Sequence, residues 1–295
     1  MKNIMISGFA DEICPDFNQQ LKTVSQLGMK YISLRSANGI NVADMTAERL
    51  QDDLLPLLQS YNIAVSSLGS PIGKIDIGDD AAFNKQLRQL EELCRIAALL
   101  NCAYIRVFSF YTPENEDPDL YTDAVLNKMR AFIEVAQQHR ITLIHENEKD
   151  IFGDTGRRCQ LLLQQLKNPW FKAAFDFANF VQCGEEPDEC WELLHEDVVY
   201  IHIKDALHST GENVLCGHGD GQIEPLLRRA IKQEGYQGFL TLEPHLVRFD
   251  SLQQLEKKDA KDIIKDNQAA SGAEAYRPFF LLNPQKGLDW RARWA

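Results

Sequence analysis

Three carboxylates and one imidazole lie at or near the ends of four consecutive strand-like runs: Glu146, Asp176, His202 and Glu243. Such groups repel one another in a small space unless positive charge lies among them. A divalent cation would supply that charge. Oxygen-rich ligation with a single imidazole suits Mn²⁺, Mg²⁺ or Co²⁺, with Zn²⁺ also compatible. The alternative is a network of ion pairs without a metal, formed with Lys204, Arg106 or Arg35.

The alternation of side chains along a strand places each of these residues on a definite face. The pairs that share a face are Glu146 with Ile144, Asp176 with Ala174, His202 with Tyr200, and Glu243 with Thr241. If these faces line the inside of a barrel, all four polar side chains converge at its open end. His145 points away by the same count, and we interpret it as a packed, hydrogen-bonded histidine.

The elements that would position these residues repeat along the chain. Eight short runs rich in Val, Ile, Phe or Tyr start 27 to 41 residues apart, at 3–8, 30–35, 62–68, 103–110, 140–146, 171–177, 198–204 and 238–243. Helical apolar stripes fill the gaps, for example Phe83, Leu87, Leu90 and Cys94. This alternation predicts an α/β fold, a (β/α)₈ TIM barrel. The alternative is an open doubly wound sheet, but residues 8–12 lack its glycine-rich turn.

The domain organisation expected from this pattern is simple. Residues 1–265 form a single barrel domain, and residues 266–295 form a C-terminal tail that packs on the barrel or on a second subunit. The tail contains an apolar stretch without helical period. A homo-oligomer is therefore one of the expected arrangements.

Charge and composition exclude several classes of protein. The chain has 31 Lys and Arg against 43 Asp and Glu, a formal net charge of −12, whereas a nucleic-acid groove needs clustered basic residues. No run reaches 18 apolar residues, and the apolar part of the N-terminus is too short for a signal peptide. Seven irregularly spaced cysteines without a CxxC pair favour free thiols. We therefore expect a cytoplasmic protein that binds neither nucleic acid nor membrane.

The chain resembles the sugar phosphate isomerases and epimerases of the xylose isomerase-like barrel superfamily. The matching segments are 9–13 (FADEI), 70–74 (SPIGK), 108–110 (FSF), 145–148 (HENE), 176–180 (DFANF), 202–205 (HIKD), 217–221 (GHGDG) and 242–245 (LEPH). The resemblance implies one divalent metal, Mn²⁺ first, held by Glu146, Asp176, His202 and Glu243. It also implies that Glu146 and Glu243 are catalytic. One removes a proton next to a carbonyl, and the other returns a proton to the opposite face of an enediolate.

The expected substrate set departs from that of the superfamily's ketohexose epimerases. Those enzymes place a histidine three residues after the metal aspartate, a substrate-binding glutamate six after the first metal glutamate, and an arginine six after the metal histidine. This chain has Asn179, Phe152 and His208 at these positions. A free ketohexose is therefore a doubtful substrate. Glu148 shares the face of Glu146 and could replace the missing carboxylate. The other substrate-binding candidates are Arg35, Lys74, Asn179, Lys204 and His245.

Each of these candidates has a structural alternative. Lys204 could hold an enediolate oxygen or a phosphate, or form an ion pair with a metal-binding carboxylate. Lys74 could bind an anionic group or be a solvated loop lysine. Arg35 could bind an anionic group or form an ion pair at the rim. His245 could contact the substrate or lie behind the metal ligands. The glycines of residues 217–221 favour a mobile loop that closes over substrate, or an ordinary connector.

The sequence thus predicts a divalent-metal-dependent isomerase or epimerase that acts on a small carbohydrate, an anionic one included. A metal-dependent dehydratase of a keto-sugar or keto-inositol is the close alternative, because it starts with the same deprotonation. A carbohydrate-binding barrel without catalysis is the second alternative, since a fold alone does not establish an activity.

Overall fold

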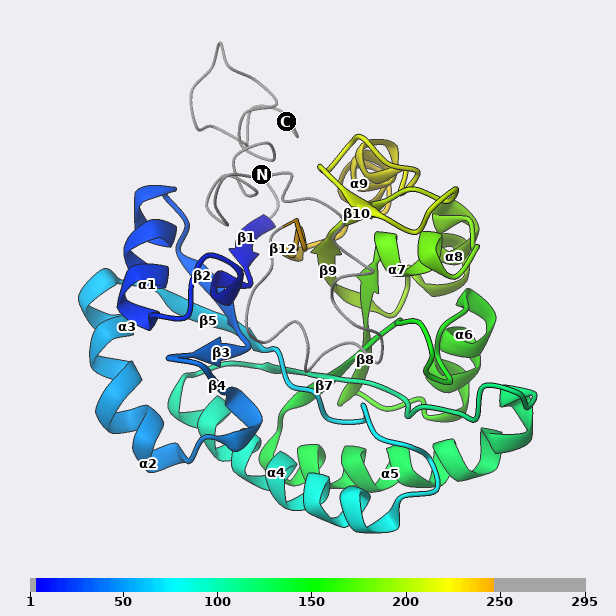
Figure 1. Cartoon of the computed structure of the whole chain (residues 1–295), viewed down its shortest axis with the longest axis horizontal. Helices are drawn as coiled ribbons and strands as arrows, with labels where there is room; N and C mark the ends of the chain where they lie inside the picture. The colour runs from blue at the N-terminus through cyan, green and yellow to red at the C-terminus, as the bar shows by residue number, and fades with distance from the viewer. Residues whose placement is uncertain (1–3, 247–295) are drawn as a thin grey trace.

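The computed structural model describes residues 4–246, and the strands of this part form one parallel barrel (Figure 1). Their order in the sheet is β1-β12-β9-β8-β7-β6-β5-β2. The two edge strands β1 and β2 lie next to each other, which makes the barrel nearly closed. The strands are β1 (Ile4–Gly8), β2 (Tyr31–Leu34), β5 (Ala64–Leu68), β6 (Tyr104–Val107), β7 (Thr142–Glu146), β8 (Phe171–Asp176), β9 (Val198–Ile203) and β12 (Gly238–Leu242).

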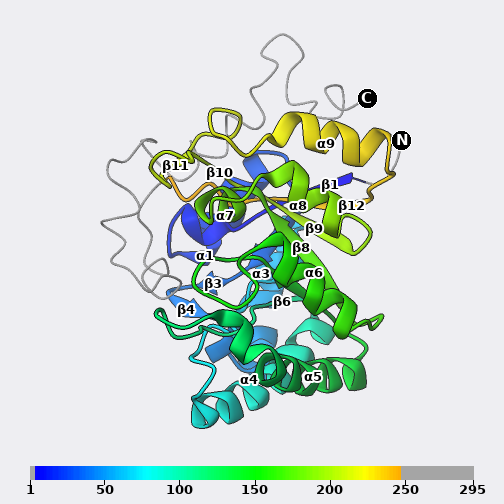
Figure 2. The same ribbon diagram turned by 90° about the vertical axis from the view of Figure 1, so that its right-hand side faces the viewer.

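Helices cover the outside of this ring of strands (Figures 1 and 2). They are α1 (Phe17–Gln26), α2 (Ala47–Arg49), α3 (Leu55–Tyr61), α4 (Asp80–Leu99), α5 (Thr122–His139), α6 (Gly156–Gln165), α7 (Phe177–Gln182), α8 (Pro187–Leu194) and α9 (Ile223–Lys232). A π-helical turn, η3 (Leu50–Leu54), joins α2 to α3, and single 3₁₀ turns are η1 (Ala10–Glu12), η2 (Val42–Asp44) and η4 (Pro118–Tyr121). The predicted TIM barrel is confirmed, and each of its eight strands overlaps a predicted run.

The inside of the barrel confirms the alternation read from the sequence. Ile144, Ala174, Tyr200 and Phe239 are buried together in a cluster separate from the main core between strands and helices. Each lies two or four residues before one of the four polar strand-end residues, on the same face of its strand. The register agrees, because Asp176 is paired with His202 across β8 and β9. The lumen therefore has an apolar floor with the polar residues above it.

Two short hairpins extend the loops at the carboxyl end of the barrel. The first pairs β3 (Ser36–Ala37) with β4 (Ile40–Asn41) after β2, and the second pairs β10 (Asp205–Ala206) with β11 (Asn213–Val214) after β9. The predicted tail, residues 266–295, and the last part of the predicted domain lie outside the described residues. No helix within residues 4–246 is both long and apolar enough to cross a membrane. The seven cysteines are free thiols.

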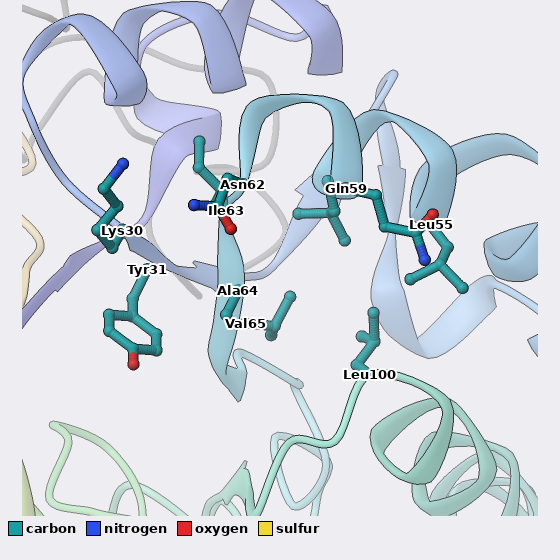
Figure 3. Close-up of a pocket in the computed structure, with 10 residues that line it drawn as sticks. Lys30, Tyr31, Leu55, Gln59, Asn62, Ile63, Ala64, Val65 and Leu100 are labelled. Carbon is teal, nitrogen blue, oxygen red and sulfur yellow. The ribbon is translucent and has the colours of Figure 1, made fainter.

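A pocket of about 470 Å³ lies at the amino-terminal ends of β2 and β5, where Lys30, Tyr31 and Ala64 line it (Figure 3). Its other walls are mostly apolar, including Leu55 and Leu100. Active sites of TIM barrels lie at the opposite, carboxyl end of the strands. No residue of this pocket is acidic or an imidazole, so we assign it no part in the chemistry below.

Candidate metal centre and active site

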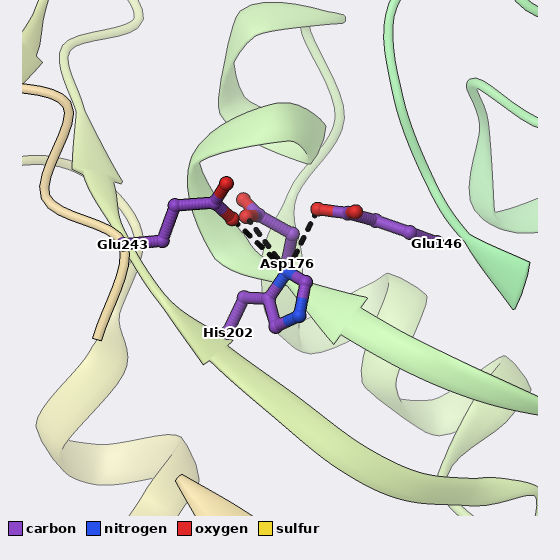
Figure 4. Close-up of side chains that lie close together, drawn as sticks. All are labelled: Glu146, Asp176, His202 and Glu243. Atoms are coloured by element: carbon purple, nitrogen blue, oxygen red, sulfur yellow. Dashed lines mark hydrogen bonds and ion pairs between the residues drawn. The ribbon is translucent and has the colours of Figure 1, made fainter. Parts of the chain in front are cut away.

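The four polar strand-end residues meet at the carboxyl end of the barrel (Figure 4). One ligand atom from each of Glu146, Asp176, His202 and Glu243 lies within 4.8 Å of the others. His202 Nδ1 is at the centre, 2.8 Å from Glu146 Oε1, 3.1 Å from Glu243 Oε2 and 3.9 Å from Asp176 Oδ2. The two glutamates approach the imidazole from opposite sides. The convergence that side-chain alternation predicted is therefore present.

These groups are almost completely buried, and their charges perturb one another. Burial opposes the charged form of His202, but Glu146 and Glu243 outweigh it and raise the pKa of the imidazole to about 9. Burial, together with the two glutamates, raises the pKa of Asp176 to about 7, against the effect of Lys204. Burial also opposes ionisation of the two glutamates, yet His202 and the basic side chains nearby lower the pKa of both.

Each glutamate also contacts its own buried arginine. Arg106 donates to Glu146 Oε2 at 3.0 Å, and Arg35 donates to Glu243 Oε1 at 2.8 Å. Both guanidinium groups lie over the ring of Phe9, with Arg35 4.5 Å and Arg106 5.0 Å from its centroid. Arg35 is fully buried and binds Asp11 with two hydrogen bonds. The structure therefore places Arg35 in a buried ion-pair network and not in an exposed ion pair at the rim.

Lys204 and Asn179 contact the metal-binding candidates from the other side. Lys204 Nζ lies 3.1 Å from Asp176 Oδ2, the ion pair that was the structural alternative for this lysine. Asn179 lies in the first turn of α7, where its backbone N–H donates to Asp176 Oδ1 at 2.9 Å. This contact is an N-cap, and it fixes the aspartate side chain. The Asn179 amide also donates to the Asn147 carbonyl oxygen at 2.8 Å.

Lys74 and Glu148 form a second buried ion pair, with 3.0 Å between Nζ and Oε2. Only 5% of the Lys74 side chain is exposed, and Nζ lies 4.5 Å from the centroid of the Phe108 ring. A solvated loop lysine is therefore excluded. The loop packs closely here, because Gly73 has φ +92° and a Cβ atom at this position would come within 2.0 Å of the Phe108 carbonyl oxygen.

The structure brings three further residues beside the metal-ligand candidates: Glu12, which the sequence did not assign to the site, His245, a substrate-binding candidate, and Arg106, named only as an alternative ion-pair partner. Glu12 lies in η1 and accepts from the backbone N–H of His245 at 2.9 Å. His245 Nε2 is 3.2 Å from Glu243 Oε1, so it lies directly beside a metal-ligand candidate. Burial raises the pKa of Glu12 to about 8. The third residue is Arg106. The feature of the sequence that indicates it is a basic side chain within an otherwise apolar strand.

His145 and the glycine loop have structural roles. His145 is buried and its Nε2 lies 3.0 Å from Ser109 Oγ, which confirms the predicted packed histidine. The loop 217–221 is held by Asp205, which accepts from the backbone N–H groups of Gly217, Gly219 and Gly221 at 2.8–3.0 Å. These bonds tie the loop to the end of β9.

The donor set fits a divalent cation. Three carboxylates and one imidazole nitrogen are spaced so that their ligand atoms could surround one ion. Asp176 Oδ2 and Glu243 Oε2 are buried and make no hydrogen bond of good geometry, although basic groups lie nearby. Buried carboxylate oxygens in this state are costly unless another partner satisfies them. Residues Glu146, Asp176, His202 and Glu243 would hold the ion.

Comparison with known families agrees with this geometry. A family model described as "Xylose isomerase-like TIM barrel" matches residues 21–270, which is most of the chain. The chain belongs to this family. The family assignment confirms the resemblance and the fold that the sequence segments predicted.

Two curated relatives of this xylose isomerase-like barrel are dehydratases. An inosose dehydratase from Mesomycoplasma hyopneumoniae is 24% identical over 219 residues, covering 64% of this chain and 71% of the relative. A 3-dehydroshikimate dehydratase from Bacillus anthracis is 23% identical over 130 residues, which are 44% of this chain. The match spans only 46% of the length of that second relative.

Solved structures show the same fold at low sequence identity. The 3-keto-D-glucoside 4-epimerase YcjR from E. coli is 13% identical with a TM-score of 0.68, covering 94% of this chain and 97% of its own. The IOLI protein, solved with a bound zinc atom, is 14% identical with a TM-score of 0.68, covering 94% and 96%. These similarities establish the barrel and leave the substrate open.

Proposed function

We propose that this protein is a divalent-metal-dependent carbohydrate isomerase or epimerase that moves a proton at a carbon next to a carbonyl. The observation that supports this most is the pair Glu146 and Glu243, which approach the same point from opposite sides (Figure 4). Inversion of a carbon centre needs a base on one face and an acid on the other. A single base can only return the proton to the face from which it came.

The residues at and around the pair have separate proposed roles in the reaction. Glu146, Asp176, His202 and Glu243 would hold the cation. When bound, the cation polarises the substrate carbonyl and makes the neighbouring C–H more acidic. One glutamate, as the carboxylate, would accept this proton, and the other, in its protonated form, would give a proton to the opposite face of the same carbon, so the two exchange protonation states in a turnover. Arg106 and Arg35 hold the two carboxylates in place, since each donates to the glutamate oxygen that does not face His202.

The remaining polar residues would bind the substrate. Lys204 lies beside Asp176 and could donate to an enediolate oxygen as negative charge develops. Lys74 and Glu148 together present a donor and an acceptor, which is the combination that sugar hydroxyls require. Asn179 and His245 border the same space, and we propose them as further hydroxyl contacts.

Dehydration is the second candidate function, because both curated relatives above are dehydratases. It begins with the same proton abstraction and then expels a hydroxyl group from the neighbouring carbon. His245 lies beside this pair, with its Nε2 3.2 Å from Glu243 Oε1, and we propose that it contacts the leaving hydroxyl.

One experiment separates the two reactions. The protein, supplied with Mn²⁺, Mg²⁺, Co²⁺ or Zn²⁺ in D₂O, is incubated with keto-sugars, 3-keto-glucosides and keto-inositols, and the products are analysed by mass spectrometry. An isomerase or epimerase gives a product of unchanged composition that contains one solvent deuterium. A dehydratase gives a product that has lost one water.

The matched variants are Glu146→Gln, Glu243→Gln and, as a control on the outer surface of α5, Glu134→Gln. We expect the first two to abolish exchange and the third to behave as wild type. Exchange at wild-type rate in either active-site variant would remove the two-glutamate mechanism. Absence of exchange with every metal and substrate would favour the binding-barrel alternative.

A further inference from the structure

The buried basic side chains at the carboxyl end of the barrel are all paired with carboxylates. Within residues 4–246, each of the four lies within 3.1 Å of an acidic oxygen: Arg35 with Asp11 and Glu243, Arg106 with Glu146, Lys74 with Glu148, and Lys204 with Asp176. Lys149 is less buried and lies 3.9 Å from the other oxygen of Glu148. With Glu12, which lies 3.4 Å from Arg35, this cluster has six acidic and five basic side chains.

This pairing disfavours the binding of an anionic substrate. A phosphate or carboxylate that contacts one of these cations would have to displace its carboxylate partner or lie close beside it, where the two negative charges repel. A displaced partner would become a buried, unpaired charge, which is strongly destabilising in proteins. An uncharged substrate avoids this cost because hydroxyl groups can add hydrogen bonds to an existing ion pair.

The glycine-rich loop gives an independent observation. Loops of this composition bind phosphate when several backbone N–H groups point into one concave space. Here the N–H groups of Gly217, Gly219 and Gly221 already point at one anion, the buried carboxylate of Asp205. Gly219 and Gly221 pack so tightly on this carboxylate that a Cβ atom would lie 2.4 and 2.8 Å from Oδ1. The anion site of the loop is therefore filled by the chain itself.

We propose that the substrate is an uncharged polyhydroxy ketone, not a phosphate ester or a sugar acid. This inference rests on the function proposed above and specifies its substrate class. The expected recognition is by hydroxyl groups that bridge existing ion pairs such as Lys74–Glu148. Keto-inositols and keto-glycosides have this chemistry, and their phosphorylated counterparts do not.

Matched pairs of ketones test the proposal. Solvent-deuterium exchange is measured for each neutral ketone and its phosphate ester, for example a 3-keto-glucoside with its 6-phosphate and a keto-inositol with its monophosphate. We expect kcat/KM to favour the neutral compounds by about 100-fold or more, equivalent to the loss of one or two charged contacts. A phosphorylated member that reacts faster than its neutral partner would overturn the proposal.

A variant that releases one cation sharpens the test. Glu148→Gln removes the carboxylate beside Lys74, so an anionic substrate no longer has to displace it. We expect the ratio of phosphorylated to neutral kcat/KM to rise about tenfold, the size of one charge-assisted hydrogen bond. Glu134→Gln is the control and leaves the ratio unchanged. A ratio that does not rise in Glu148→Gln would contradict the pairing argument.

A binding measurement separates this inference from the proposed function. Radiolabelled inorganic phosphate is equilibrated by dialysis with the full chain after metal removal, so that no cation offers a binding site. No saturable binding below about 10 mM is expected for the wild type, because each cation and the loop amides are occupied. If no ketone undergoes exchange, the proposed function fails, and this result still supports the absence of an anion site. Saturable phosphate binding that is lost in Lys74→Gln would overturn the inference whatever the exchange results.

Discussion

Glu146 and Glu243 each direct one carboxylate oxygen at His202 Nδ1, at 2.8 and 3.1 Å, and the other oxygen toward a buried arginine. The two contacts fix both torsion and position of each carboxylate. The pair is thus prepared before substrate arrives, as a site that acts through proton transfer requires. It also makes both glutamates sensitive to changes that preserve size but remove charge.

The first prediction concerns these two carboxylates. Glu146→Gln and Glu243→Gln should each reduce kcat for the reaction by about 10²- to 10⁴-fold, because an amide cannot accept the proton. The measurement is solvent-deuterium exchange with the substrate found in the screen above. Circular dichroism and the unfolding midpoint serve as controls, since the amide keeps the volume of the side chain. A loss of fold in parallel with activity would leave a structural explanation in place of the catalytic one.

The second prediction concerns the imidazole at the centre of the site. His202→Ala removes one of four ligands, and we expect the divalent metal to bind at least about 100-fold more weakly. Competition with a chromophoric chelator measures the affinity directly. Chelation of the wild-type protein should lower its unfolding midpoint, because a ligand that binds only the folded state stabilises it. Equal metal affinity in wild type and His202→Ala would show that another set of residues holds the ion.

Much of the barrel and the convergence of the four polar side chains could be predicted because both follow from local rules. Strand periodicity gave the eight strands, and alternation of side chains placed Glu146 above Ile144 and His202 above Tyr200. Parallel strands in one barrel bring their carboxyl ends together. Residues that end consecutive strands of the repeat were therefore expected to lie close together in space. The clustering of the four polar side chains needed no further information, whereas their assignment as metal ligands came from the family resemblance.

The partners of those ligands could not be predicted in the same way. The contact between Arg35 and Glu243 joins residues 208 positions apart, and its geometry depends on how β2 and β12 close the barrel. The pairing of Lys74 with Glu148 depends on the loop after β5 folding back over β6. The sequence around these residues does not indicate which partner each side chain contacts. The sequence of residues 217–221 showed the glycines, but it did not show that their backbone N–H groups donate to Asp205.

The third prediction tests the arginine that holds Glu146. Arg106→Leu leaves a buried carboxylate without its partner and should lower the free energy of unfolding by about 3–5 kcal/mol in the metal-free protein. Urea denaturation measures the difference. Arg49→Leu is the matched control, because its ion pair with Asp53 is half exposed and should contribute no more than about 1 kcal/mol. Similar losses in the two variants would argue against a special role for Arg106.

The fourth prediction uses a buried thiol remote from the metal ligands. Burial raises the pKa of Cys102 from 9.0 to about 12. The unfolded chain therefore releases this proton first, and the thiol stabilises the folded state fully below pH 9 and progressively less as the pH rises toward 12. The difference in unfolding free energy between wild type and Cys102→Ala should accordingly shrink across this window. A difference that is constant with pH would mean that the thiol is accessible to water.

The last prediction concerns the loop that Asp205 holds. A Cβ atom on Gly219 would lie 2.4 Å from Asp205 Oδ1 and 2.5 Å from the Ala206 carbonyl oxygen, so Gly219→Ala must displace the loop. We expect a loss of about 1–3 kcal/mol and faster hydrogen exchange of the loop amides. Gly78→Ala is the control, because nothing lies within 4 Å of its Cβ position and its φ is unstrained. If Gly219→Ala leaves the loop amides as protected as Gly78→Ala does, the N–H groups are not fixed on Asp205, and the argument that the loop has no room for a phosphate fails with it.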